Sequence, residues 1–143
     1  MLDFPLKATD ETVLEGVKKW VELLAAERYD EAVQWLYYPP AAARWTPLLL
    51  KSLVTNYGLT DPRADGKTYR VTPLVTTKSR VGGHPYQDVE WFPAGSAQVC
   101  RGVVGFVTFD LPLNGEWSDV TATFLIHKVT DRLLLELEDM HVL

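Results

Sequence analysis

The chain has 143 residues, a length at which one domain buries about two thirds of the surface that its unfolded form exposes. Hydrophobic residues make up 47% of it and charged residues 23%, which excludes the composition of a disordered chain. The formal net charge is -5, and the basic residues are dispersed along the sequence. Because nucleic acids are bound through clustered Lys and Arg, we expect a single domain, residues 1–143, that binds no nucleic acid.

A single cysteine, Cys100, has no partner for a disulfide within the chain and excludes a zinc site built from several cysteines. The 3 histidines lack metal-ligand spacing, so we expect no metal and no other cofactor. The first residues show no basic stretch followed by an apolar run, and no run of about 20 apolar residues occurs. These features predict a cytoplasmic protein without a signal peptide or membrane contact.

Apolar residues in the first half recur at helical spacing and predict three helices. The first covers residues 10–27, and the second is a short helix that ends before Pro39, because proline lacks the amide donor that a helix needs. The third covers residues 48–57 and has the clearest limits, with Thr46 as N-cap and Gly58 as its left-handed stop.

The middle of the chain predicts two strands. Residues 67–77 are rich in β-branched side chains and predict a strand that Pro73 interrupts or places at an edge. A turn at Gly82 and Gly83 follows, and residues 86–92 predict the second strand.

The closing part of the chain consists of alternating runs joined at Asn114-Gly115, a strong hairpin signal because both residues accept a positive φ. A two-residue turn at this place pairs Phe109 with Val120 and Val107 with Ala122. All four then lie on one face of the sheet.

A second hairpin at Thr130-Asp131 pairs Phe124 with Leu137 and Ala122 with Asp139. Both registers select the same apolar face. Since a slip of one residue would turn every side chain to the other face, this agreement supports an antiparallel sheet.

The simplest register also places Asp110 opposite Asp119, and like charges opposed across a sheet are unfavourable. Pro112 cannot donate to the ladder and suits an edge or a bulge. Three interpretations stay open: a bulge near Pro112 separates the two carboxylates, both are solvated, or they form a paired-carboxylate site.

Three helices, the second opened by Tyr29-Asp30-Glu31-Ala32, thus precede a long antiparallel sheet that closes the chain. In this order of elements the chain resembles the nuclear transport factor 2-like superfamily, the cone-shaped fold of ketosteroid isomerase and scytalone dehydratase. The closing stretch, from Gly115-Glu116-Trp117-Ser118-Asp119-Val120-Thr121-Ala122 to Leu137-Glu138-Asp139-Met140-His141-Val142-Leu143, is similar to bacterial domains of this type. The resemblance implies an α+β fold with N-terminal helices packed on a curved antiparallel sheet. The superfamily includes enzymes, small-molecule binders, dimerisation modules and immunity proteins against secreted toxins, so it does not select a function.

Five residues are candidates for a pocket: Asp139, His141, Arg101, Tyr38 and Trp45. Strand alternation places Asp139 and His141 on the inner face, where they are either a base and its orienting partner or the solvated end of the sheet. Arg101 points to the same face and either binds an anionic group or reaches out at the rim. The two aromatic residues either line the mouth of an apolar pocket or belong to the core.

The outward face of the strands carries four apolar candidates for an interface: Val104, Phe106, Leu125 and Met140. Such a face is too apolar to be wholly solvated. Either it binds a partner, as in a homodimer, or residues 67–92 cover it.

The sequence contains no Gly-rich phosphate loop and no nucleophile elbow. We therefore expect a binding or interaction domain, for example a toxin-immunity or accessory protein, that uses its pocket or its sheet face on a protein partner or a small apolar ligand. The alternative is a small isomerase or dehydratase for an apolar substrate, with Asp139 or His141 as general base.

Overall fold

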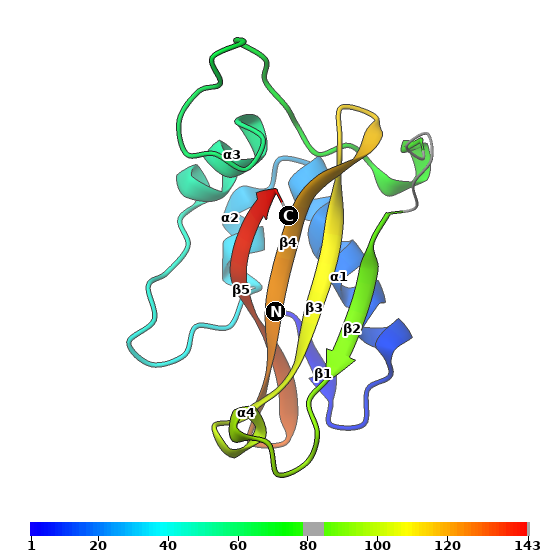
Figure 1. Cartoon of the computed structure of the whole chain (residues 1–143), viewed down its shortest axis with the longest axis vertical. Coiled ribbons are helices and arrows are strands. Elements are labelled where there is room, and N and C mark those ends of the chain that lie inside the picture. Colours follow the sequence, from blue (N-terminus) through cyan, green and yellow to red (C-terminus); the bar gives the residue numbers. More distant parts are fainter. Residues whose placement is uncertain (79–84, 143) are drawn as a thin grey trace.

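The computed structural model describes residues 1–78 and 85–142, and it has the expected α+β architecture (Figure 1). Helices from the N-terminal part pack on one face of a curved antiparallel sheet with strand order β1-β5-β4-β3-β2. The helices are α1 (Asp10–Ala25), α2 (Tyr29–Gln34), α3 (Pro47–Thr55) and α4 (Ala97–Cys100). The strands are β1 (Asp3–Pro5), β2 (Gln87–Trp91), β3 (Val103–Leu113), β4 (Glu116–Val129) and β5 (Arg132–Val142).

Helix α1 begins and ends with recognisable caps. The hydroxyl of Thr9 accepts a hydrogen bond from the backbone N–H of Thr12 at 3.2 Å, so Thr9 is the N-cap of α1. At the other end Glu27 has a φ of 59°, and the N–H of Arg28 donates to the carbonyl of Leu23 at 2.9 Å. This is the Schellman ending of a helix, with a glutamate at the position that usually holds glycine.

The inner face of α1 packs on the middle of the sheet. Trp20 is fully buried, and its ring meets that of Phe124 on β4 edge-on, with centroids 5.3 Å apart. Its indole N–H donates to the carbonyl of Ala32 in α2 at 2.9 Å. Trp20 therefore joins the first two helices and the sheet in one core.

The start of helix α3 agrees with the predicted N-cap. The hydroxyl of Thr46 accepts from the N–H of Leu49 at 3.1 Å, and Pro47 occupies the first turn. Gly58 has a φ of 85°, and its N–H donates to the carbonyl of Leu53 at 2.7 Å, but the first left-handed residue is Tyr57, with a φ of 57°. The helix therefore ends at Thr55, and its left-handed stop begins one residue before the predicted Gly58. None of the helices in the described ranges is long and apolar enough to cross a membrane.

The predicted strand over residues 67–77 is wrong. Val71 forms only an isolated bridge with Leu113, and a short 3₁₀ turn covers Leu74–Thr76. Pro73 directly precedes that turn, where its fixed φ suits a bend and its missing N–H prevents ladder pairing. The second predicted strand is confirmed as β2, while the turn expected at Gly82 and Gly83 lies outside the described residues.

The first closing hairpin has the predicted turn but a different register. Beyond a bulge between Asp110 and Pro112, Phe109 lies opposite Ala122 instead of Val120. The displacement amounts to two residues, so Phe109 and Ala122 still share the inner face, and both are fully buried. The bulge also separates Asp110 from Asp119, as one of the three interpretations required.

The second closing hairpin starts in the predicted register, with Phe124 opposite Leu137. A bulge then shifts the pairing by one residue, so Met140 lies opposite Ala122, and Asp139 lies opposite Thr123. A shift of one residue reverses the faces. The expected placement of Asp139 on the inner face and of Met140 on the outer face is therefore wrong: Met140 is fully buried.

Candidate functional site

The face of the sheet that points away from α1 is the first candidate site; we call it the outer face. In Figure 1, α1 lies behind β2 and β3, α2 and α3 stand beside β5, and no labelled helix crosses the middle of β3 and β4 on the near side. Side chains on neighbouring strands form cross-strand rows here. The central row is Glu90, Phe106, Leu125 and Glu136, and the next row is Asp88, Thr108, Thr123 and Asp139.

The centre of the outer face is apolar and its two sides are acidic. Phe106 and Leu125 are directly opposed on β3 and β4, and both are partly exposed. Each row has a carboxylate at both of its ends, one on β2 and one on β5. The acidic residues with partly or fully exposed side chains on the described part of the outer face include Asp3, Asp88, Glu90, Glu136 and Asp139, and the Arg132 guanidinium is bound to Asp3 at 3.3 Å.

Val104, another of the four apolar interface candidates, does not belong to this face. It stands at a register shift between Val103 and Gly105, where the alternation of β3 is interrupted. Its side chain packs against the core, and it lines a cleft that also contains Leu133, a buried residue of the inner face. The outer face therefore retains Phe106 and Leu125 from the four predicted residues.

Asp139 and His141 lie on the outer side of β5, opposite Thr123 and Thr121. Their side chains are 53% and 39% exposed. The Nδ1 atom of His141 lies 3.2 Å from Oδ2 of Asp139 without hydrogen-bond geometry, and Oδ1 of Asp139 accepts from the N–H of Met140 at 2.7 Å. The two residues are neighbours, but they do not line the interior.

Arg101 does not point to the inner face of the sheet, because it precedes β3 as the exposed C-cap of α4. Its N–H donates to the carbonyl of Gln98 at 3.0 Å. The short helix α4 was not predicted, and it ends the alternation from which the position of Arg101 was inferred.

Tyr38 and Trp45 lie in the loop between α2 and α3, packed against the core. The Tyr38 hydroxyl donates to the carbonyl of Val33 at 2.8 Å, and the guanidinium of Arg44 lies 4.0 Å from the centre of the Tyr38 ring. The indole of Trp45 donates to the carbonyl of Leu137 at 2.9 Å. The Tyr38 bond ties the loop to α2, and the Trp45 bond ties it to β5. The structure does not bring the five pocket candidates together.

The outer face also carries an imidazole with a carboxylate partner. Nε2 of His127 lies 2.8 Å from Oε1 of Glu136, and the Tyr37 ring packs on the imidazole with a centroid distance of 5.0 Å. The N–H of Tyr37 donates to the carbonyl of Leu135 at 2.7 Å, which fixes the start of the loop at the edge of β5. Glu136 at the end of the central row is thereby held in place.

The two aspartates that the bulge separates both act as acceptors. Asp110 is buried and accepts from the Thr121 hydroxyl at 2.8 Å and from the N–H of Tyr86 at 2.9 Å. Asp119 accepts from the Tyr57 hydroxyl, and burial together with this carboxylate raises the pKa of Tyr57. Because they face different partners, a paired-carboxylate site is excluded for Asp110 and Asp119.

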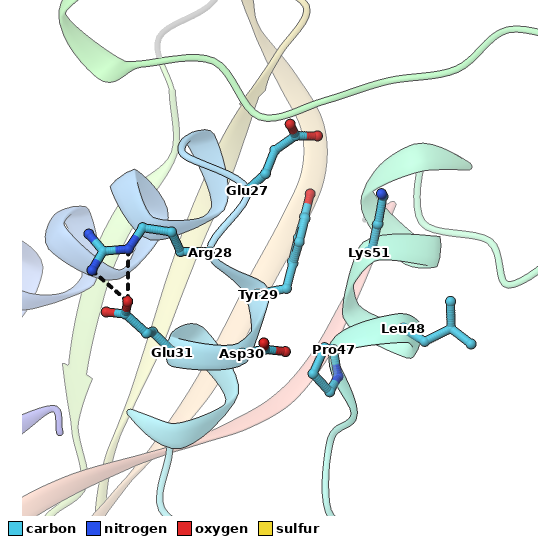
Figure 2. A pocket seen from close by; sticks show the side chains of 8 residues that line it. All are labelled: Glu27, Arg28, Tyr29, Asp30, Glu31, Pro47, Leu48 and Lys51. Atoms are coloured by element: carbon cyan, nitrogen blue, oxygen red, sulfur yellow. Dashed lines mark hydrogen bonds and ion pairs between the residues drawn. The ribbon is translucent and has the colours of Figure 1, made fainter.

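Sequence reasoning missed a cleft of about 560 Å³ between the α1–α2 junction and α3 (Figure 2). Its walls are Glu27, Arg28, Tyr29, Asp30, Glu31, Pro47, Leu48 and Lys51. The Tyr29 ring stands in its middle, with Lys51 facing it from α3. Only 7% of Tyr29 is exposed. The segment Tyr29-Asp30-Glu31 is visible in the sequence, but its charges are also what the first turn of any helix favours.

Burial, with a smaller effect of the Glu27 carboxylate, raises the pKa of Tyr29 from 10.0 to about 12. The neutral hydroxyl therefore stabilises the fold below pH 10, and this contribution is lost as the pH rises from 10 to about 12. In this window we expect the free energy of unfolding to fall with rising pH on account of Tyr29.

Chemical denaturation at several pH values checks this expectation when wild type is compared with Tyr29→Phe, which lacks the titrating group. The variant should lose less stability than wild type between pH 10 and 12. Parallel pH profiles for the two proteins would contradict a raised pKa for Tyr29.

Within the described parts of the chain, no three His, Cys, Asp or Glu side chains lie close enough together to hold a metal ion. The outer face and the Tyr29 cleft are two candidate binding places among the described residues. In comparisons with protein-family models, with curated proteins and with solved structures, the chain matches none of them.

Proposed function

We propose that the protein is a non-catalytic interaction domain of the nuclear transport factor 2-like type, and that its outer face binds a basic protein partner. The observation that carries the proposal is the directly opposed pair Phe106 and Leu125, partly exposed at the centre of an acidic sheet face. A small apolar centre inside a polar rim is the usual anatomy of a protein interface.

Charge favours a basic partner over a second copy of the chain. A twofold dimer through the outer face would bring the same carboxylates of both copies together, among them Asp88, Glu90 and Asp139. Like-charge contact of this kind opposes association, whereas a lysine- or arginine-rich surface would neutralise it and associate faster. A toxin-immunity or accessory role agrees with binding of this type.

The enzyme alternative has less support. It requires Asp139 or His141 as a general base inside an apolar cavity, but both side chains lie on the outside of β5. On the inner face the space beside the sheet is filled by large buried side chains, including Trp20, Phe109 and Phe124. A general base must come within hydrogen-bond reach of its substrate, and the side chains of Asp139 and His141 are 53% and 39% exposed rather than enclosed by the described residues.

Site-specific photo-crosslinking in the native host tests the proposal. A photoreactive amino acid replaces Phe106 in one version of the protein and Leu48, which is 75% exposed on α3, in a matched control. We expect position 106 to crosslink one protein with a basic surface, and position 48 not to crosslink it. The crosslink should disappear when Leu125→Ser is added, because that substitution removes half of the apolar centre.

Two results would contradict the proposal. One is crosslinking of position 106 only to another copy of the chain, which would make the outer face a dimer interface. The other is the same set of captured proteins from positions 106 and 48, which would mean non-specific contact.

A further inference from the structure

An apolar cleft lies beside α4, at the end of the sheet where β2 ends and β3 begins (Figure 1). Its volume is about 290 Å³, at the small end of the range for small-molecule sites. Seven of the eight described residues that line it are apolar, among them Leu6, Trp91, Phe92, Val99 and Val104. The eighth is Lys128, and we call this site the Lys128 cleft.

Lys128 is a charged residue at an inner-face position of the sheet. On β4 it follows the fully buried Ile126 by two residues, and on β5 it lies opposite the buried Leu133. Its backbone N–H donates to the carbonyl of Gly102 at 2.8 Å, which fixes the end of β4 against the turn after α4. Among residues 1–78 and 85–142 its ammonium has no ion-pair partner. The cleft therefore combines an apolar lining with one unpaired cation.

The wall at Trp91 is formed in advance by its neighbours. The indole N–H of Trp91 donates to a carboxylate oxygen of Asp10, at the start of α1, at 2.5 Å. On β3 the residue opposite Trp91 is Gly105, where a Cβ would come within 3.2 Å of the Trp91 ring and 2.7 Å of the Glu90 carbonyl oxygen. Glycine thus leaves room for the ring, and the hydrogen bond to Asp10 holds it in place.

Apolar surface remains uncovered in the cleft. Leu6 is 43% exposed and Trp91 is 37% exposed, although both lie against buried inner-face residues of the sheet end. The register shift in β3 adds Val104 to the same lining. Covering these side chains with an apolar chain would remove their surface from water, which favours binding.

We propose that the Lys128 cleft binds a medium-chain monocarboxylate, a molecule with one carboxylate on an unbranched apolar chain. The chain packs against Leu6, Trp91 and Val104, and the carboxylate accepts from the Lys128 ammonium at the rim. A single cation in an apolar lining complements a single anion, whereas a neutral chain leaves the cation unpaired. The site lies on the other side of the sheet from Phe106 and Leu125, and it does not depend on the proposed function.

Calorimetric titration of the whole wild-type protein with three probes tests the proposal. Octanoate carries both the chain and the charge, octanamide keeps the chain without the charge, and acetate keeps the charge without the chain. We expect saturable binding of one octanoate per protein, about fivefold tighter than that of octanamide, which is the upper gain for an exposed ion pair. Acetate should not bind measurably, because it has no apolar chain to bury.

Variants assign the charge and the apolar wall to their residues. Lys128→Met keeps an apolar stem without the ammonium, so it should remove the preference for octanoate and leave octanamide binding unchanged. Leu6→Ser should weaken octanoate and octanamide several-fold and to the same extent. Lys51→Met and Leu48→Ser are the matched controls on α3, because both residues are exposed there and do not line the cleft, and both variants should bind like wild type.

The proposal is overturned if octanoate shows no saturable binding to the wild type, or if octanamide or acetate binds as tightly as octanoate. Retention of the octanoate preference in Lys128→Met, or its loss in Lys51→Met, would also overturn it. Crosslinking from position 106 reports on the opposite side of the sheet, so failure of this site and failure of the proposed function are distinguishable.

Discussion

Met140→Ala is expected to lower the free energy of unfolding by about 2 to 5 kcal/mol, the usual cost of truncating a fully buried methionine. Met140 lies opposite Ala122 on the inner face because a bulge shifts the end of β5 by one residue. His141→Ala is the matched control, and since 39% of the His141 side chain is exposed, its cost should stay within about 0.5 kcal/mol.

Equilibrium unfolding in urea measures both effects, with equal slopes showing that only stability has changed. Unbroken alternation along β5 would place His141 inside and Met140 outside. A large loss for His141→Ala together with a small loss for Met140→Ala would therefore contradict the bulge.

Trp20→Ala is expected to have the largest effect on the fold, about 3 to 5 kcal/mol or more. The substitution removes a fully buried indole, its edge-on contact with Phe124 and its hydrogen bond to the carbonyl of Ala32. Trp20→Phe keeps an aromatic ring and should recover part of this loss, while the carbonyl of Ala32 still lacks the indole donor.

Trp91 provides the control for Trp20. It is 37% exposed, and its indole donates to Asp10 at the surface, so Trp91→Ala should cost less than Trp20→Ala in the same denaturation experiment. Equal losses for the two alanine variants would contradict the central position of Trp20 in the core.

Much of the fold is predictable from the sequence because local chemistry determines it. Thr46 begins α3 through a side-chain cap, and α3 ends before two left-handed residues, Tyr57 and the predicted Gly58; signals of this kind depend only on neighbouring residues. The turn at Asn114-Gly115 has positive φ at both positions, as its residue types indicate. Alternation selects the face of Phe124 correctly, since that residue lies close to its turn.

Errors in the prediction begin where a bulge or an extra element interrupts alternation. The bulge in β5 adds one residue that no periodic signal reveals, so every later side chain, including Asp139 and Met140, was assigned to the wrong face. Similarly, Arg101 was counted as part of a strand although α4 ends there. β1 was missed because three residues are too few to show a period of two, and it forms only by pairing with β5.

The candidate sites were predictable only in part. Phe106 and Leu125 were identified from alternation, whereas the acidic rim was not, because Asp88 and Glu136 belong to strands that are distant in the chain and meet only through the strand order of the sheet. The Tyr29 cleft depends on how α3 packs beside α2, which no local pattern encodes.

The central claim is that the outer face binds a basic partner. Its most direct test is isothermal titration calorimetry with the protein that crosslinks to position 106. We expect Phe106→Ser with Leu125→Ser to weaken binding at least about 100-fold, because the two residues form the apolar centre. Asp88→Asn with Glu90→Gln should weaken it less and reduce its dependence on salt. Unchanged affinity in the Phe106 and Leu125 variant, or salt dependence unaffected by the loss of both carboxylates, would contradict the account.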